Sequence, residues 1–296
     1  MTVATSEHPP IPGYELLRLL GRNAHLIYLA RQLSSGRFVH LNVVHSSGDF
    51  GRMVAGSLRQ QAALLATLDH PNILQPVEVG EAQGYGFFSA LEYAGGGCLA
   101  DKIRSGPLMP VEAVSLARNI AGALRYARKQ DAVVFDLTPR SVLLTEDELP
   151  KLGEFRPLRP ERGDVIGLRV FTPSYAAPEE VSDSERMEQS PGTDVYRIGA
   201  VLYAMLTGQP PFVGNGDRRG LLRQVVERSP APLRQRNSAV STDLEAICMK
   251  CLAKSPTSRY AEPENLTDIL DQFLALSQRL AEPNAVADGG RGNGFL

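Results

Sequence analysis

The strongest hydrophobic pattern in the chain lies before the Pro-Pro pair at 210–211. Five apolar residues recur there every three to four positions, a spacing that places side chains on one face of an α-helix. They are Val195, Ile198, Leu202, Met205 and Leu206. A Pro-Gly pair at 191–192 precedes them and Gly208 follows them. The pattern therefore predicts a buried helix that is capped at Thr193 or Asp194 and ends near Gly208.

A second apolar stripe predicts a helix in the stretch 241–260. Its members are Leu244, Ile247, Cys248, Cys251 and Leu252. Thr242 and Glu245 have the spacing of a capping box, in which each side chain bonds the backbone amide of the other residue. Cys248 and Cys251 lie on the stripe, and the sequence has no second pair of ligands with metal-site spacing. We therefore expect buried structural thiols in preference to a zinc or redox site.

Several motifs, in order along the chain, carry a resemblance to one family. The segment Ser190–Phe212 resembles the central C-lobe helix of Hanks-type serine/threonine protein kinases, and its amino-acid sequence is most similar to that of bacterial members. The residues Thr172–Glu179 resemble the segment that ends in the family's Ala-Pro-Glu motif, and Arg259 resembles the family's C-lobe arginine. In the family, this glutamate and this arginine form a buried ion pair. The resemblance thus implies structural roles for Glu179, Arg259 and Asp194.

Further matches place most of the chain on the same framework. His70–Leu74 resembles the turn after the family's regulatory helix, and Leu91–Gly97 resembles the hinge between its lobes. The resemblance covers roughly residues 14–275 and implies an α+β, bilobal fold, with a small β-rich N-lobe, one regulatory helix and a larger, mainly helical C-lobe. The expected organisation is a flexible tail at 1–10, a kinase-like domain at 11–281 (N-lobe 11–91, hinge 92–97, C-lobe 98–281) and a flexible tail at 282–296.

Composition limits the classes of partner and the compartment. The chain has 296 residues and a formal net charge of −2, which gives no reason to expect nucleic acid or an anionic membrane as partner. The sequence has no apolar run long enough to span a bilayer, and residues 1–13 lack the basic and apolar regions of a signal peptide. We therefore expect no membrane insertion and a cytoplasmic location.

The resemblance also locates the positions that would handle ATP, and most of them are changed. Kinases hold the ATP phosphates under a glycine-rich turn, because glycine lets backbone amides approach the phosphates closely. Only Gly21 of the three glycines remains, with Asn23 and His25 at the other two positions. The matching nucleotide-binding positions at and below the hinge are Glu92, Ala94 and Leu143.

Two charged residues that anchor the phosphates in the family are replaced by amides. Asn42, in the strand Arg37–Val44, occupies the position of the lysine, and Gln61 occupies that of its glutamate partner. A neutral Asn42–Gln61 hydrogen bond would hold the regulatory helix without an unpaired buried charge. His40 occupies the position that packs on adenine, where its larger ring would fill the adenine slot. The first lysine in the chain is Lys102, beyond the hinge, so no N-lobe lysine can substitute.

The catalytic loop keeps one acid. Asp136 aligns with the family's base and would accept the proton of a substrate hydroxyl. The alternative interpretation is a vestigial acid that is bonded to loop amides. Ser141 replaces the metal-binding asparagine, Thr138 replaces the lysine that steadies the phosphoryl group, and Phe135 replaces the arginine that reads an activation-loop phosphate. We therefore expect no phosphate-triggered ordering of that loop through residue 135.

The metal-binding Asp-Phe-Gly motif of the family aligns with Glu154-Phe155-Arg156. Glu154 with Ser141 would hold magnesium only weakly, because this carboxylate is one methylene longer and Mg²⁺ demands near-ideal octahedral geometry. Arg156 brings a guanidinium close to this carboxylate. We therefore expect a Glu154–Arg156 ion pair at the metal position in preference to a metal ion.

These changes favour one function over two alternatives. The expectation is a pseudokinase, a kinase-fold scaffold or regulatory protein that binds a protein partner, with negligible phosphotransfer and no cofactor. One alternative is a weak or unconventional ATP-dependent serine/threonine kinase that uses Asp136 and a Glu154-bound Mg²⁺ or Mn²⁺. The other is a noncatalytic nucleotide-binding switch that uses hinge backbone groups. The partner is not specified by the sequence, and a homodimer is one option.

The stretch 217–236 concentrates arginine. It contains Arg218, Arg219, Arg223, Arg228, Arg234 and Arg236 with few acids, in the region where the resemblance places the family's substrate-side helix. Two interpretations stay open, a surface for an acidic partner or a solvated helix face.

Overall fold

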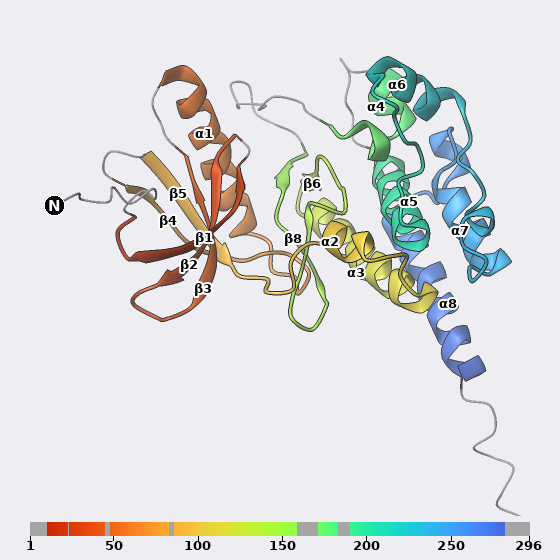
Figure 1. Cartoon of the computed structure of the whole chain (residues 1–296), viewed down its shortest axis with the longest axis horizontal. Coiled ribbons are helices and arrows are strands. Elements are labelled where there is room, and N and C mark those ends of the chain that lie inside the picture. The colour runs from red at the N-terminus through yellow and green to blue at the C-terminus, as the bar shows by residue number, and fades with distance from the viewer. Residues whose placement is uncertain are drawn as a thin grey trace, which may run out of the picture.

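A computed structural model of the chain describes residues 11–22, 24–44, 48–82, 86–158, 171–182 and 190–281. Within these ranges a β-rich part is followed by a mainly helical part, as Figure 1 shows. The expected tails at 1–10 and 282–296 lie outside the described residues.

The N-terminal part is a five-stranded antiparallel sheet with the strand order β1-β2-β3-β5-β4. The strands are β1 (Tyr14–Arg22), β2 (Leu26–Gln32), β3 (Phe38–Val43), β4 (Pro76–Ala82) and β5 (Gly86–Glu92). β3 is the middle strand and is buried from Val39 onward. Its register places Asn42 opposite Ser89 and His40 opposite Leu91. The sheet thus fixes two candidate site residues on its most protected strand.

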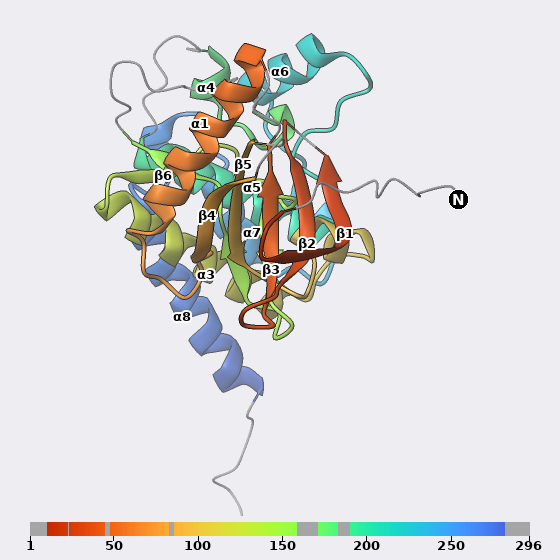
Figure 2. The same ribbon diagram turned by 90° about the vertical axis from the view of Figure 1, so that its left-hand side faces the viewer.

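One helix, α1 (Gly48–Leu65), lies against this sheet (Figure 2). Val54, Ala55 and Leu58 of α1 form a small core with Val44 and Phe87 of the sheet side. The last residue of α1, Leu65, belongs instead to the core of the helical part. The helix therefore bridges the two parts, as expected for the single regulatory helix.

The C-terminal part consists of helices with two short strand pairs, β6–β9 and β7–β8. The helices are α2 (Leu99–Arg104), α3 (Pro110–Lys129), α4 (Pro178–Ser182), α5 (Pro191–Thr207), α6 (Arg218–Glu227), α7 (Thr242–Cys251) and α8 (Pro263–Ala281), with 3₁₀ turns η1 (Pro173–Tyr175), η2 (Leu233–Gln235) and η3 (Pro256–Ser258). The short strands are β6 (Ala132–Val134), β7 (Val142–Leu144), β8 (Pro150–Leu152) and β9 (Phe155–Pro157). None of the described helices is long and apolar enough to cross a membrane. The α+β, bilobal fold expected from the sequence is confirmed.

The central helix α5 is buried on all sides from Gly192 to Leu206. Its predicted cap was wrong, because the N-cap is Ser190, whose hydroxyl accepts a hydrogen bond from the Thr193 amide at 3.2 Å. Pro191 therefore stands inside the first turn, where a helix does not need its missing N–H. The predicted end is confirmed, since Gly208 has φ 76°, a left-handed conformation that costs glycine little.

Helix α7 is shorter than predicted and differs in its cap. It ends at Cys251, and its N-cap is Ser241, whose hydroxyl accepts from the Leu244 amide at 3.2 Å. The predicted capping box with Thr242 and Glu245 does not form, because the Glu245 carboxylate accepts from the backbone amide of Arg234 at 2.7 Å. Cys248 and Cys251 are free and fully buried, and burial raises the pKa of both thiols.

Candidate functional site

A neutral polar cluster occupies the position on β3 that the resemblance assigns to the phosphate lysine. The Asn42 side chain is 8% exposed and donates from Nδ2 to Ser89 Oγ at 3.2 Å. The ring of His25, which precedes β2, makes a polar contact with the Asn42 side chain. Burial outweighs this contact and lowers the pKa of His25, so the imidazole is neutral at pH 7. Asn23 lies outside the described residues.

Gln61 binds elsewhere than expected. Its Nε2 donates to the backbone carbonyl of Gly153 at 2.7 Å, so the predicted Asn42–Gln61 hydrogen bond was wrong. The physical reason is that the Gln61 amide can donate to a carbonyl, whereas the ionised glutamate at this position in the kinase family can only accept hydrogen bonds. Gln61 therefore attaches α1 directly to the residue before Glu154.

His40 lies at the hinge end of the same strand. Its side chain is 8% exposed, and its ring centroid lies 5.0 Å from that of Tyr93. Burial lowers the pKa of His40, while an interaction with the backbone of Ala94 acts in the opposite direction. No hydrogen-bond partner of His40 Nε2 is found in the described part of the chain. A neutral ring of this protein thus contacts the hinge residue that matches a nucleotide-binding position.

The other matching nucleotide positions are built into the framework. The Glu92 carboxylate accepts from Lys151 Nζ at 2.7 Å and from the Gln75 amide at 3.0 Å. Leu143 is partly buried on β7 and forms an isolated bridge with Cys98. Gly21 pairs with Ile27 near the end of the β1–β2 ladder.

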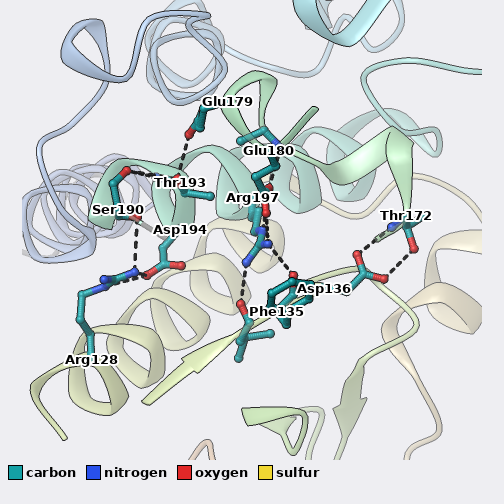
Figure 3. A network of polar contacts seen from close by, with 12 residues as sticks. Arg128, Phe135, Asp136, Thr172, Glu179, Glu180, Ser190, Thr193, Asp194 and Arg197 are labelled. Atoms are coloured by element: carbon teal, nitrogen blue, oxygen red, sulfur yellow. Dashed lines mark hydrogen bonds and ion pairs between the residues drawn. The ribbon is translucent and has the colours of Figure 1, made fainter. Parts of the chain in front are cut away.

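Asp136 is held by one residue of a distant segment. Thr172 donates its backbone amide to Asp136 Oδ1 at 3.0 Å and its hydroxyl to Oδ2 at 2.7 Å (Figure 3). The Ser141 hydroxyl lies 3.1 Å from the Asp136 carbonyl and 3.0 Å from the Thr138 carbonyl, and it accepts from the Thr138 amide at 3.0 Å. Both carboxylate oxygens of Asp136 therefore accept hydrogen bonds from Thr172. The Ser141 hydroxyl is bonded to backbone groups of the catalytic loop.

Glu154 lies close enough to Asp136 for the two charges to interact. We call the region of His40, Asn42, Asp136, Ser141 and Glu154 the cleft. The surrounding protein and the charge of Asp136 raise the pKa of Glu154 to about 7, and Arg156 opposes this shift. Many protein atoms surround the Glu154 carboxylate. The residue is nevertheless exposed at the surface, so solvent reaches its side chain. Within the described ranges, no group of three His, Cys, Asp or Glu side chains is arranged to hold a metal ion.

The predicted Glu154–Arg156 ion pair is absent from the described structure. The guanidinium of Arg156 lies over the ring of Phe135 instead, 5.1 Å from its centroid. This contact follows from the pairing of β6 with β9, which places Arg156 opposite Val133, close to Phe135 in the chain. An aromatic face at residue 135 therefore attracts the cation that was expected at the carboxylate.

Beneath the catalytic loop lies a buried ion pair that the sequence interpretation missed. Arg197 of α5 donates to Glu180 of α4 from Nη2 and from Nε, the latter at 3.1 Å, and both side chains are almost fully buried. The same guanidinium donates to the carbonyls of Val134, at 2.5 Å, and Phe135. Figure 3 shows this network beside Asp136. The sequence signal was a single arginine among apolar positions of a buried helix, which requires a partner.

Two further ion pairs hold α5 in place. Arg259 donates to both oxygens of Glu179, at 2.7 and 2.8 Å, and Arg259 is 5% exposed. Arg128 of α3 donates to Asp194 Oδ2 from Nε and Nη2, at 2.9 and 2.6 Å. Burial raises the pKa of Asp194, and the charge of Arg128 opposes this. These pairs lie away from the cleft, which gives them a structural role.

The chain matches one protein family over most of its length. Residues 14–272 match the model described as the protein kinase domain. The chain belongs to this family. It is 30% identical over 262 residues to the serine/threonine-protein kinase PknB of Mycobacterium leprae and 30% identical over 259 residues to PknB of Mycolicibacterium smegmatis. Each match covers 83% of this chain and 40% of the relative.

A more distant relative is a probable serine/threonine-protein kinase of Clostridium perfringens, 26% identical over 279 residues. That match covers 91% of this chain and 40% of the relative. The chain thus spans about two fifths of the length of these curated relatives, all of which are named serine/threonine-protein kinases.

The residues in the cleft do not fit ATP with a divalent metal. The lysine position is a buried amide bonded to Ser89, and the hinge residue Ala94 contacts His40. The metal positions offer Glu154 and a Ser141 hydroxyl that is already bonded to loop carbonyls. A triphosphate would bring negative charge next to two carboxylates without the cation that compensates them in the family.

Proposed function

We propose that this kinase-domain protein is a pseudokinase, which binds a protein partner and carries out negligible phosphotransfer. The observation that carries the proposal is the state of Asn42. This residue is buried, neutral and bonded to Ser89 where phosphoryl transfer needs a cation. Phosphoryl transfer depends almost entirely on positioned charges, so a neutral cluster at this point removes a main contribution to transition-state binding.

Two further observations support the proposal. His40 contacts Ala94 at the hinge, so a side chain of the protein competes with any base for the same backbone group. The framework pairs Glu179–Arg259 and Glu180–Arg197 are intact beneath this altered cleft. A chain that retains its packing while its cleft is neutral at the key position is suited to recognition by surface contacts.

The second candidate is the weak or unconventional serine/threonine kinase, and one observation favours it. Asp136 raises the pKa of Glu154, so the two carboxylates are close enough to repel each other. A divalent cation between them would relieve this repulsion. The third candidate, a nucleotide-binding switch without turnover, needs base binding at Glu92 and Ala94 despite His40.

A thermal-shift titration with ATP separates the three candidates. The purified protein is heated at rising ATP concentrations up to the millimolar range, with Mg²⁺, with Mn²⁺ and with EDTA. A ligand that binds the native state raises the melting temperature by mass action. We expect no shift in any condition and no transfer of radiolabelled phosphate to a generic protein substrate.

Each other outcome selects a different candidate. A metal-dependent shift with phosphate transfer that is lost in Asp136→Ala would establish the weak kinase. A shift without transfer would establish the switch. Either result would reject the proposal of a pseudokinase that does not bind nucleotide.

A further inference from the structure

Four exposed arginines lie on α6 and its C-terminal cap, and we call them the α6 arginine surface. They are Arg218, Arg219, Arg223 and Arg228. None of their guanidinium groups lies within 4.0 Å of a carboxylate in the described part of the chain. The arginines of α3 in the same lobe behave differently, because Arg118, Arg125 and Arg128 all contact acids. Among the described residues, the α6 arginine surface therefore carries positive charge that no ion pair compensates.

The placement of these charges opposes the stability of α6. Arg218 and Arg219 stand in the first turn, at the positive end of the helix dipole, while Glu227 stands at its negative end. Arg219 and Arg223 are four residues apart, so two like charges share one face. Each such arrangement destabilises a helix. Helix α3 has the favourable order instead, with an acid in its first turn and cations in its last.

The one acid at the start of α6 is already used as a cap. Asp217 accepts from the Arg219 backbone amide at 3.0 Å. Within the part of the chain that the structure describes, the arginines are thus neither paired with acids nor placed where they would stabilise the helix. A function at the surface accounts for them better than the stability of α6 does.

The α6 arginine surface adjoins the segment that holds Asp136. Helix α6 packs against α4 and η1, and Figure 1 shows α6 beside α4 at the top of the helical part. The Arg218 guanidinium lies 5.7 Å from the centroid of the Phe171 ring, next to Thr172. Arg236 does not belong to this surface, because its Nη1 donates to Gln209 Oε1 at 2.8 Å.

We propose that the α6 arginine surface docks an acidic segment of a protein partner. This inference rests on the proposed function, since it specifies the partner that the pseudokinase binds. Guanidinium groups bind carboxylates through two parallel hydrogen bonds, so arginines on one helix face match acids spaced along a peptide. Leu222 and Val226 are partly exposed between the arginines and offer apolar contacts to such a peptide.

The same surface is poorly suited to nucleic acid or to an anionic membrane. The chain has a net charge of −2, whereas nucleic-acid binding domains are commonly basic overall. In the described part of the chain, the exposed phenylalanines are Phe38 and Phe50, both in the N-terminal lobe. Helix α6 therefore offers no exposed aromatic ring for stacking on bases. It also offers no fully exposed large apolar side chain for insertion into lipid, since Leu222 and Val226 are only partly exposed.

The test is fluorescence anisotropy with the full chain and a fluorescein-labelled peptide in which Glu and Asp alternate with Leu. The decisive variant is R219E/R223E, and the matched control is R18E/R37E. Arg18 and Arg37 are exposed N-lobe arginines without ion pairs in the described structure. Both double variants change the net charge equally. All four positions are exposed, so we expect both variants to fold, and a melting temperature near that of the wild type verifies this.

We expect the acidic peptide to bind, and R219E/R223E to weaken binding at least about tenfold while R18E/R37E changes it less than about twofold. A peptide with Gln and Asn in place of the acids is expected not to bind. Equal weakening by both double variants, no binding of the acidic peptide, or tighter binding of single-stranded DNA or phosphatidylserine vesicles through the same arginines would overturn the proposal.

The two proposals fail in distinguishable ways. Docking of the peptide through Arg219 and Arg223 together with ATP-dependent phosphotransfer would reject the pseudokinase and leave the docking surface standing. Absence of both peptide docking and nucleotide binding would reject the docking surface alone.

Discussion

The guanidinium of Arg156 lies over the ring of Phe135, with its carbon 5.1 Å from the ring centroid. In the kinase family, the position of Arg156 matches the glycine of the metal motif, and the position of Phe135 matches the arginine of the catalytic loop. Two departures from the family pattern therefore form a single contact. The β6–β9 pair brings them together, so the catalytic loop and the metal segment are joined by a cation over an aromatic face.

A double-mutant cycle measures this contact. Phe135→Leu and Arg156→Met each remove one partner while they retain an apolar side chain. We expect a coupling free energy of about 0.5–1 kcal/mol between them in urea unfolding. If the destabilisations add without coupling, the two residues do not stabilise each other.

The Glu179–Arg259 pair should be essential for stability. Arg259→Ala leaves a carboxylate without its partner and removes buried hydrogen bonds to the backbone, so we expect a loss of about 3–5 kcal/mol in the free energy of unfolding. The control is Arg118→Ala, which breaks the exposed pair with Asp271 and should cost at most about 1 kcal/mol. Similar losses in the two variants would contradict a special role of the buried pair.

Glu154 should make stability depend on pH. Its pKa is raised from 4.5 to about 7 in the native state, so the native chain holds the proton more tightly than the unfolded chain does. The stability that this group contributes is therefore present at low pH and is lost as the pH rises through about 7.

Glu154→Gln stays neutral at all pH values. We expect the variant to gain about 1 kcal/mol relative to the wild type between about pH 5 and pH 8, because solvent at the side chain reduces the full effect. The measurement is urea unfolding at both pH values, with Glu262→Gln as an exposed control. A constant difference between Glu154→Gln and the wild type across this range would show that Glu154 titrates alike in both states.

The sequence predicted the fold better than it predicted the contacts of the cleft. The helical period of Val195 to Leu206 and the stop at Gly208 are local signals, and α5 follows them. The caps were misplaced by one to four residues, because several Ser and Thr side chains near each start compete for the same amides. Motif order along the chain indicated the arrangement of the two lobes.

The contacts in the cleft depend on distant segments, which local patterns do not specify. Gln61 bonds to Gly153 because α1 packs against β9, and Arg156 packs on Phe135 because β9 runs beside β6. Both relationships appear only in the folded chain. Arg197 was the one missed residue with a usable signal, since a buried helix rarely carries an unpaired arginine. Its partner Glu180 directly follows Glu179, the residue that the sequence assigns to the ion pair with Arg259.

Restoring the charged pair of the family tests how far the cleft has changed. Asn42→Lys alone places an ammonium at a position that is 8% exposed, so we expect a loss of about 2–4 kcal/mol in stability. Adding Gln61→Glu supplies a partner but gives up the bond to Gly153, so about half of this loss should return.

The double variant should still give no ATP-dependent thermal shift, because His40 remains in contact with the backbone of Ala94 at the hinge. The triple variant with His40→Ala frees this group and is the first in which we expect a shift with millimolar ATP and Mg²⁺. His40→Ala alone is the control, and without a cation it should show none. A shift already in the double variant would mean that the missing charge, and not the ring of His40, is what excludes the nucleotide.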